Sequence, residues 1–171
     1  MTDFSKFVRD IPDFPKPGIV FKDITPLLKE PSVFRDAIDA IAAHYEPKDI
    51  DVVVGIDARG FIFGSALAYR LGTGFVPIRK KGKLPYHTYE ASYDLEYGTD
   101  TLAIHQDAFP PGSRVVICDD VIATGGTISA SIELVEKLGG LMVGVAVLIE
   151  LTFLKGREKF ANHEIFSLIE F

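Results

Sequence analysis

The sequence has little of several features that mark whole classes of protein. Its 171 residues include one cysteine, Cys118, so an internal disulfide is impossible and a reducing compartment is expected. The longest apolar run, residues 141–149, is far shorter than the roughly 20 residues of a membrane span. Residues 1–4 lack the basic and apolar regions of a signal peptide. We therefore expect a cytoplasmic protein without a membrane partner.

Basic side chains are in the minority. There are 18 lysines and arginines against 24 aspartates and glutamates, a formal net charge of −6, so a nucleic-acid partner is not expected. The exception is the run Arg79-Lys80-Lys81-Gly82-Lys83, in which only one of the consecutive residues is uncharged. Such a run is either a solvated face or a site for an anion, and the run by itself leaves both open.

Several common catalytic motifs are absent as well. The sequence has no Gly-Lys-Ser/Thr phosphate loop and no G-x-G-x-x-G dinucleotide loop. His44, His105 and His163 are dispersed, without the spacing of a metal site. No Ser-His-Asp arrangement is apparent. Metal held directly by protein ligands and triad hydrolysis are therefore not expected.

Apolar runs alternate along the chain with segments of helical spacing. The runs are continuously apolar, which is typical of a parallel sheet covered by helices on both faces. We therefore predict one α/β domain over residues 1–171, with a doubly wound, mainly parallel sheet flanked by helices. The predicted strands are 51–55, 75–78, 101–105, 115–118, 141–149 and 165–169, and the predicted helices are 31–44, 59–71 and 128–138.

Two segments show no clear helix or strand pattern. Residues 1–20 contain several prolines near their end, so only the first ten residues are candidates for a helix. Residues 80–98 are polar and aromatic, with no clear period. Because ligands bind at the carboxyl ends of parallel strands, a site is expected just after Gly55, Ile78 and Cys118.

The strongest functional signal is a strand that runs into two aspartates and a glycine loop. Residues 115–127 read Val-Val-Ile-Cys-Asp-Asp-Val-Ile-Ala-Thr-Gly-Gly-Thr. The loop at 123–127 opens a helix, where backbone amides and threonine hydroxyls can surround a phosphate. Asp119 and Asp120 can accept hydrogen bonds from sugar hydroxyls, so the segment suits a phosphorylated sugar. The alternative is a plain strand-to-helix turn with solvent-facing aspartates, which the order of two aspartates and two threonines disfavours.

The same residues closely resemble the phosphoribosyl-pyrophosphate (PRPP) signature of type I phosphoribosyltransferases. Four further segments narrow the resemblance to the adenine phosphoribosyltransferase family. The family's reaction converts adenine and PRPP to AMP and pyrophosphate and serves purine salvage. The resemblance implies that Mg²⁺ enters the site bound to PRPP and to water. The resemblance also implies a homodimer, a base-binding segment at 1–30 and a mobile hood loop at 80–98. The further segments are 14–28, 55–64, 79–85 and 91–98.

Roles for individual residues follow from the same resemblance. It implies that Glu96 exchanges a proton with N7 of adenine and that Tyr97 lines the reacting ribose. It implies a pyrophosphate-binding loop with a non-proline cis peptide between Asp57 and Ala58. The catalytic set is then Glu96, Arg59 and Tyr97, and the adenine-binding set is Val20, Phe21, Lys22 and Leu151. The PRPP-binding set is Asp57, Ala58, Arg59, Arg79, Lys80, Lys83, Asp119, Asp120, Ala123, Thr124, Gly125, Gly126 and Thr127.

Two alternative functions remain at this point. One is a transferase for a 6-oxopurine, for which Lys155 is the only residue that could serve the oxo group. The other is a PRPP-sensing regulator that has lost catalysis. Such a regulator should carry a nucleic-acid-binding surface and a degraded hood loop, so the net charge of −6 and the intact Glu96-Tyr97 pair disfavour it.

Overall fold

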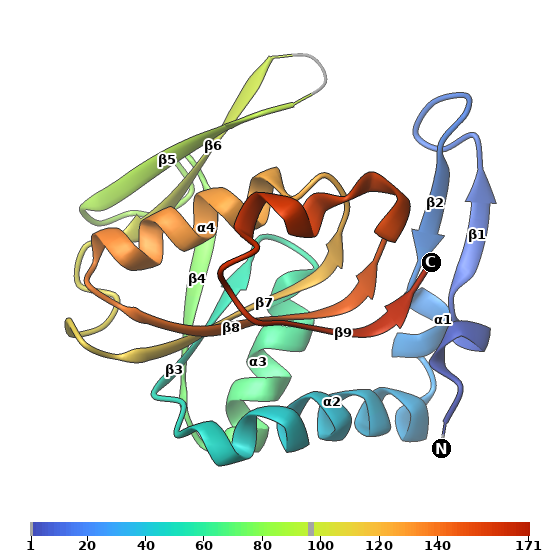
Figure 1. The fold of residues 1–171 in the computed structure, drawn as a ribbon, viewed down its shortest axis with the longest axis horizontal. Helices are drawn as coiled ribbons and strands as arrows, with labels where there is room; N and C mark the ends of the chain where they lie inside the picture. The colour runs from blue at the N-terminus through green and yellow to red at the C-terminus, as the bar shows by residue number, and fades with distance from the viewer. Residues whose placement is uncertain (1, 96–97) are drawn as a thin grey trace.

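The computed structural model describes residues 2–95 and 98–171. In that part of the chain, seven strands form one sheet in the order β5-β6-β4-β3-β7-β8-β9 (Figure 1). Strands β4, β3, β7, β8 and β9 are parallel, whereas β6 runs antiparallel to β4, and β5 antiparallel to β6. The predicted α/β fold with a mainly parallel sheet is confirmed. The strands are β3 (Val52–Ile56), β4 (Gly74–Lys80), β5 (Thr88–Asp94), β6 (Thr99–His105), β7 (Arg114–Ile122), β8 (Leu141–Glu150) and β9 (Ile165–Glu170).

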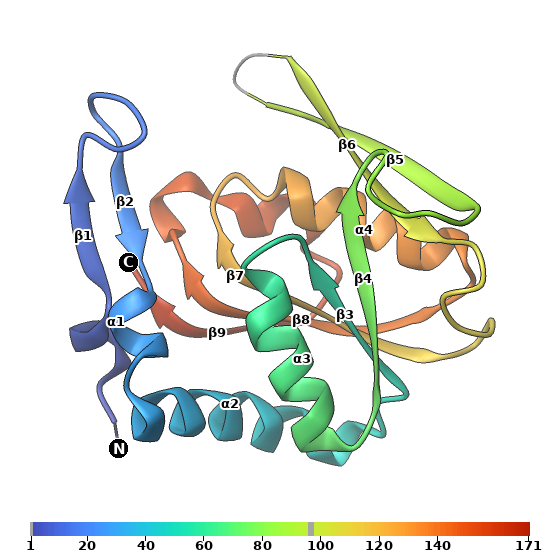
Figure 2. The same cartoon turned by 180° about the vertical axis from the view of Figure 1, so that it is seen from behind.

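Three longer helices cover the two faces of this sheet. Helix α4 (Gly126–Lys137) packs on one face, and α2 (Pro31–Tyr45) and α3 (Gly60–Leu71) pack on the other (Figures 1 and 2). Short helical turns are α1 (Thr25–Leu28), η1 (Phe4–Phe7), η2 (Glu46–Lys48), η3 (Thr152–Leu154) and η4 (Gly156–Phe160). Within the described ranges no helix has the length and apolar character needed to cross a membrane.

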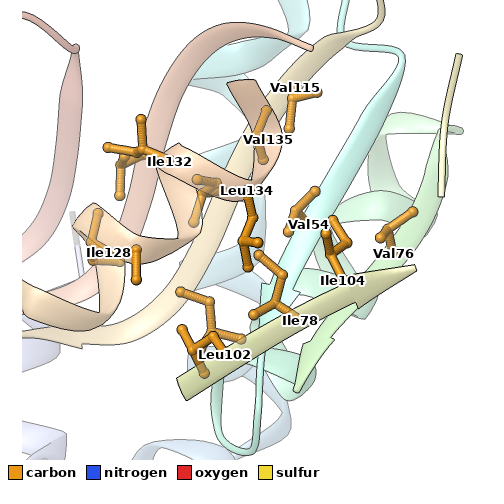
Figure 3. Close-up of a cluster of buried hydrophobic side chains, with 14 of the residues drawn as sticks. Val54, Val76, Ile78, Leu102, Ile104, Val115, Ile128, Ile132, Leu134 and Val135 are labelled. Atoms are coloured by element: carbon orange, nitrogen blue, oxygen red, sulfur yellow. The ribbon is translucent and has the colours of Figure 1, made fainter. Parts of the chain in front are cut away.

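The continuous apolar character of the central strands follows from burial on both faces. Successive side chains of a strand point to opposite sides. In β3, Val54 lies in the core beneath α4, together with Leu134 and Val135 of that helix (Figure 3). Its neighbour Val53 lies in the opposite core, with Ile41 of α2. Since neither face meets water, no polar alternation appears in the sequence.

The N-terminal segment forms an antiparallel hairpin, and the short 3-10 turn η1 lies within the first ten residues, the stretch in which the sequence allowed a helix. Strand β1 (Arg9–Pro12) pairs with β2 (Val20–Asp23), preceded only by the short turn η1. The hairpin stands beside the edge of the sheet that carries β9 (Figures 1 and 2). Phe4 and Phe7 pack against the core shared with α2 and α3, which fixes the segment through tertiary contacts rather than local propensity.

Part of residues 80–98 is regular, in contrast to the expectation of a segment without a clear period. Strand β5 pairs with β6 in register from Thr88↔His105 to Asp94↔Thr99. Tyr89, Ala91 and Tyr93 face the core beneath α4, while the residues between them are exposed. This is a period-two pattern that the sequence carries. The mobility of the hood loop itself stays a prediction.

Candidate active site

A cavity of about 310 Å³ opens at the carboxyl ends of β3, β4 and β7. This is the edge of the sheet at which the sequence predicted a ligand site. Segments far apart in the chain meet here, because neighbouring parallel strands end side by side. The lining residues are Ile56, Asp57, Ala58, Arg59, Lys80, Tyr93, Leu102, Asp119, Asp120, Val121, Ile122, Ala123, Thr124, Gly125, Gly126, Thr127 and Ile128.

The loop from Ala123 to Thr127 is built to bring backbone amides to the cavity. Gly125 has φ +81°, a conformation that side chains strain, and its carbonyl accepts a hydrogen bond from the Ser129 amide at 2.9 Å. A Cβ on Gly125 would lie 2.4 Å from the carbonyl oxygen of Gly156, so the loop packs directly against the backbone at the start of η4. The amides at the start of α4 have no partner within the helix and favour an anion.

Asp119 and Asp120 lie buried at the end of β7. Nε of Arg59 lies 2.9 Å from Oδ2 of Asp120, and the Asp120 amide donates to Oδ1 of Asp119 at 2.9 Å. Burial and the neighbouring Asp120 charge raise the pKa of Asp119 well above its ordinary value. Burial also raises the pKa of Asp120, although Arg59 opposes the shift. Carboxylate oxygens that line a cavity can accept hydrogen bonds from the hydroxyls of a sugar.

The loop after β3 forms the opposite wall. The peptide between Asp57 and Ala58 is cis, as the family resemblance implied. The Asp57 amide donates to the carbonyl of Ile78 at 2.9 Å, and its carboxylate accepts a hydrogen bond from Arg79 Nε at 3.0 Å. These contacts tie the loop to the end of β4.

Side chains alternate along β4, so consecutive residues of the basic run point to opposite sides of the strand. Lys80 lines the cavity, and its Nζ lies 2.9 Å from Oδ2 of Asp100. Arg79 and Lys83 are not among the lining residues. Arg79 contacts Asp57 and donates to the carbonyl of Lys83 at 3.3 Å. Of the three basic residues expected here, the structure brings Lys80 to the cavity wall and Arg79 into contact with Asp57 of the loop after β3.

The residues predicted to bind adenine lie on two elements. The ring centroid of Phe21, on β2, is 5.0 Å from Cζ of Arg59. The hairpin therefore contacts a residue that lines the cavity. Its neighbour Val20 is 49% exposed. Lys22 is turned away, since its Nζ lies 2.7 Å from Asp10 Oδ1 and 3.8 Å from the ring centroid of Phe171.

Leu151 follows β8, and its amide donates to the Ile122 carbonyl at 2.9 Å, beside the end of β7. The preceding Glu150 is buried, and Arg157 Nε donates to its Oε1 at 2.8 Å. That hydrogen bond lowers the pKa of Glu150. The segment that carries Leu151 is therefore anchored by an ion pair next to the loop at 123–127.

Glu96 and Tyr97, two of the three predicted catalytic residues, lie outside the described residues. Tyr93 on β5 and Leu102 on β6 also line the cavity, and neither was among the residues predicted from the sequence. The period-two pattern of β5 could have indicated Tyr93. Across the described ranges, no group of three or more His, Cys, Asp or Glu side chains is placed to hold a metal ion.

Comparison with known proteins decides the family. The model of the phosphoribosyl transferase domain matches residues 23–168. The curated adenine phosphoribosyltransferase of Roseiflexus sp. strain RS-1 is 56% identical over 99% of both chains. The chain belongs to the adenine phosphoribosyltransferase family. The resemblance stated from the sequence, and with it the enzyme class of pentosyltransferases, is confirmed.

Solved structures of the same family agree with the fold. The crystal structure of adenine phosphoribosyltransferase from Thermoanaerobacter pseudethanolicus has a TM-score of 0.96 at 54% identity and covers 99% of this chain and 98% of its own. The adenine phosphoribosyltransferase of Saccharomyces cerevisiae, complexed with adenine and an imino-altritol bisphosphate, has a TM-score of 0.94 at 45% identity and covers 97% and 96%. These family members favour adenine over the 6-oxopurine and regulator alternatives.

Proposed function

We propose that this chain transfers the 5-phosphoribosyl group of PRPP to N9 of adenine, yielding AMP and pyrophosphate. Because the chain belongs to this family, one observation is the main support for this activity. The loop at 123–127, the Asp119-Asp120 pair and Arg59 line a single cavity at the sheet edge. Amides suit a phosphate, carboxylates suit a diol, and a guanidinium suits an anionic leaving group.

The substrate PRPP would lie along this cavity from the phosphate loop to the basic wall. The 5′-phosphate accepts hydrogen bonds from the amides and hydroxyls of residues 123–127. Asp119 and Asp120 accept hydrogen bonds from the two ribose hydroxyls. The pyrophosphate lies against the 57–59 loop and Lys80, with Arg79 and Lys83 completing the positive field. The assignment is supported by the distances and burial given above.

The reaction forms the N9–C1′ bond of AMP while the bond from C1′ to the pyrophosphate oxygen breaks. Positive charge develops on the ribose, so the chain contributes mainly by positioning and by neutralising charge. For N9 to attack through its lone pair, adenine reacts as the tautomer that carries its proton on N7. Glu96 is the proposed acceptor of that N7 proton. Tyr97 is proposed to line the ribose, and closure of the hood loop at 80–98 is proposed to exclude water.

The base is proposed to lie between the hairpin and the segment after β8. Phe21 stacks on the purine, while Val20, Lys22 and Leu151 complete its surroundings. A backbone carbonyl in this wall accepts a hydrogen bond from the 6-amino group. A 6-oxo group there would oppose two acceptors, which is costly in a buried site, so adenine is selected over hypoxanthine and guanine.

A Mg²⁺ ion is proposed to arrive with PRPP, held by substrate oxygens and water. The donor chemistry of the cavity fits this arrangement, because Asp57, Asp119 and Asp120 supply carboxylate oxygens that can accept hydrogen bonds from metal-bound water. When bound, the ion neutralises part of the charge of the pyrophosphate.

A cytoplasmic homodimer is proposed as the working form. The dimer rests on the family resemblance and is supported by apolar side chains on the outer face of α3, where Ile62 is 39% exposed and Tyr69 is 90% exposed. Sedimentation equilibrium measures the mass in solution directly, and a monomer at micromolar concentration would contradict it.

The activity is tested by measuring AMP formation from adenine, PRPP and Mg²⁺, with hypoxanthine and guanine in parallel. We expect product from adenine only. Product from a 6-oxopurine instead would mean that the base wall at 20–22 and 151 is assigned incorrectly. Tight binding of PRPP without product from any base would support the regulator.

A further inference from the structure

Lys80 is held at the cavity by a carboxylate that the sequence analysis did not single out. Its Nζ lies 2.9 Å from Oδ2 of Asp100, at the start of β6. The same Oδ2 accepts a hydrogen bond from the Tyr93 hydroxyl at 3.4 Å, and Oδ1 accepts one from the Thr101 amide at 2.9 Å. The ion pair raises the pKa of Lys80 and lowers the pKa of Asp100, so both are charged at neutral pH.

The three side chains lie together because of the sheet register. Tyr93 is the cross-strand partner of Asp100, and Lys80 is the partner of Leu102, two residues further along β6. Since side chains alternate along a strand, Asp100 and Leu102 point to the same side of the sheet. Lys80, Tyr93 and Leu102 all line the cavity. Asp100 therefore lies beside the cavity, in contact with Lys80.

The carboxylate and a bound anion would compete for one ammonium group. The side chain of Lys80 is 59% exposed and that of Asp100 is 24% exposed. Separating the pair therefore leaves neither charge fully buried. A pyrophosphate oxygen that contacts Lys80 must displace Asp100 or share the ammonium with it. The negative charge of Asp100 also repels a polyanion in the cavity.

We propose that Asp100 competes with pyrophosphate for Lys80 and thereby promotes release of the leaving group. The inference rests on the proposed function. Asp100 is a positioning residue, since it acts through Lys80 and not on the reacting atoms. It weakens the hold of the site on pyrophosphate and returns Lys80 to its resting position once the product has left.

Calorimetric titration of magnesium pyrophosphate into the wild type and Asp100→Asn tests the proposal. Asparagine keeps the size of the side chain and an acceptor for Tyr93 but removes the charge. We expect binding to tighten by about two- to fivefold, the range of an exposed ion pair, with a smaller difference at high salt. Structural damage would have the opposite sign, so unchanged or weaker binding overturns the proposal.

Two further variants separate competition for Lys80 from a general charge effect. Glu90→Gln removes a carboxylate from the same pair of strands, and this carboxylate lies 2.8 Å from Lys81 Nζ, outside the cavity lining. We expect Glu90→Gln to change the affinity by less than Asp100→Asn does. In a Lys80→Ala background, Asp100→Asn should lose most of its effect. An undiminished effect there overturns the proposal.

Failure of the inference is distinguishable from failure of the proposed function. A wild-type chain that forms AMP, paired with an Asp100→Asn variant that binds pyrophosphate no tighter, overturns the inference alone. A folded wild-type chain that neither forms AMP nor binds pyrophosphate overturns both.

Discussion

At the scale of single residues, Arg59 joins the two parts of the candidate site. Its Nε lies 2.9 Å from Asp120 Oδ2, and its Cζ lies 5.0 Å from the ring centroid of Phe21. Arg59 lies at the N-terminal end of α3, where the helix dipole disfavours a cation unless an anion is close by. The buried carboxylate of Asp120 supplies that anion before any substrate binds. The β1–β2 hairpin, which carries Phe21, and the end of β7, which carries Asp120, are therefore connected through one side chain.

Gly125 carries a prediction at the same scale. Gly125→Ala would place a methyl group 2.4 Å from the Gly156 carbonyl at φ +81°, so it adds a clash to backbone strain. We expect a loss of at least about 2 kcal/mol in unfolding free energy, measured in urea, and a large rise in KM for PRPP.

The matched control for this prediction is Gly112→Ala. Gly112 has a similar φ of +85°, and no atom of the described residues lies within 4 Å of its added Cβ. The control should lose only the strain contribution, about 1–2 kcal/mol, with KM for PRPP unchanged. Equal effects of the two variants on KM for PRPP would contradict the assigned role of the loop.

Site residues could be predicted from the sequence where they lie next to one another in the chain. Asp119, Asp120 and the loop at 123–127 form one motif, so their proximity was evident from the sequence. Tyr93 reaches the cavity only through the pairing of β5 with β6, which is a tertiary contact. Arg79 and Lys80 were assigned together, yet they are neighbours on one strand, and the alternation of side chains sends them to different places.

At the scale of elements, Asp23 joins the two strands of the β1–β2 hairpin to each other and to the start of α1. Arg9 Nη2 lies 2.6 Å from Oδ2 of Asp23, and the Thr25 amide donates to its Oδ1 at 2.9 Å. The sequence did not predict this hairpin. Its strands are short, a proline-rich loop separates them, and the pairing depends on contacts with distant parts of the chain. The long helices were predictable because their apolar spacing is set by the face they bury.

The stability contributed by Asp23 should depend on pH. The hydrogen bond from the Thr25 amide, followed by Arg9, lowers the pKa of Asp23 from 3.8 to about 2. A carboxyl with a depressed pKa stabilises the fold above its unfolded-state pKa and loses that contribution as pH falls through its folded-state pKa. Asp23→Ala should cost about 1.5 kcal/mol in urea unfolding at neutral pH, and the difference from the wild type should shrink below about pH 4.

Asp10→Ala is the control for this pH dependence. It removes the exposed pair with Lys22 in the same hairpin, whose side chains are 57% and 14% exposed. We expect a cost below about 1 kcal/mol at neutral pH. A gap between the wild type and Asp23→Ala that stays constant down to about pH 3 would show that the Asp23 carboxylate does not carry the effect.

At the scale of the whole molecule, the parallel sheet determines where the candidate site lies. Strands β3, β4 and β7 are neighbours, so their carboxyl ends must meet whatever the connecting segments do. The order of the strands was not readable from the sequence. The continuous apolar runs showed burial on both faces, but they did not show which runs are adjacent, because adjacency is decided by packing across the whole sheet.

The cavity exists only when this sheet is assembled, so substrate binding should stabilise the entire fold. Its walls come from the 57–59 loop, β4, β5, β7 and the start of α4, which are not held together in the unfolded chain.

With PRPP and Mg²⁺ at about 100 times the dissociation constant, the free energy of unfolding should rise by about 2.7 kcal/mol, measured by urea titration. Asp120→Asn, measured at the same ligand concentration, should lose most of this increment. Asp39→Asn, which alters an exposed ion pair with Arg70 on another part of the surface, should keep it. An increment that survives in Asp120→Asn would place PRPP elsewhere, because a ligand stabilises only through the site that it occupies in the folded state.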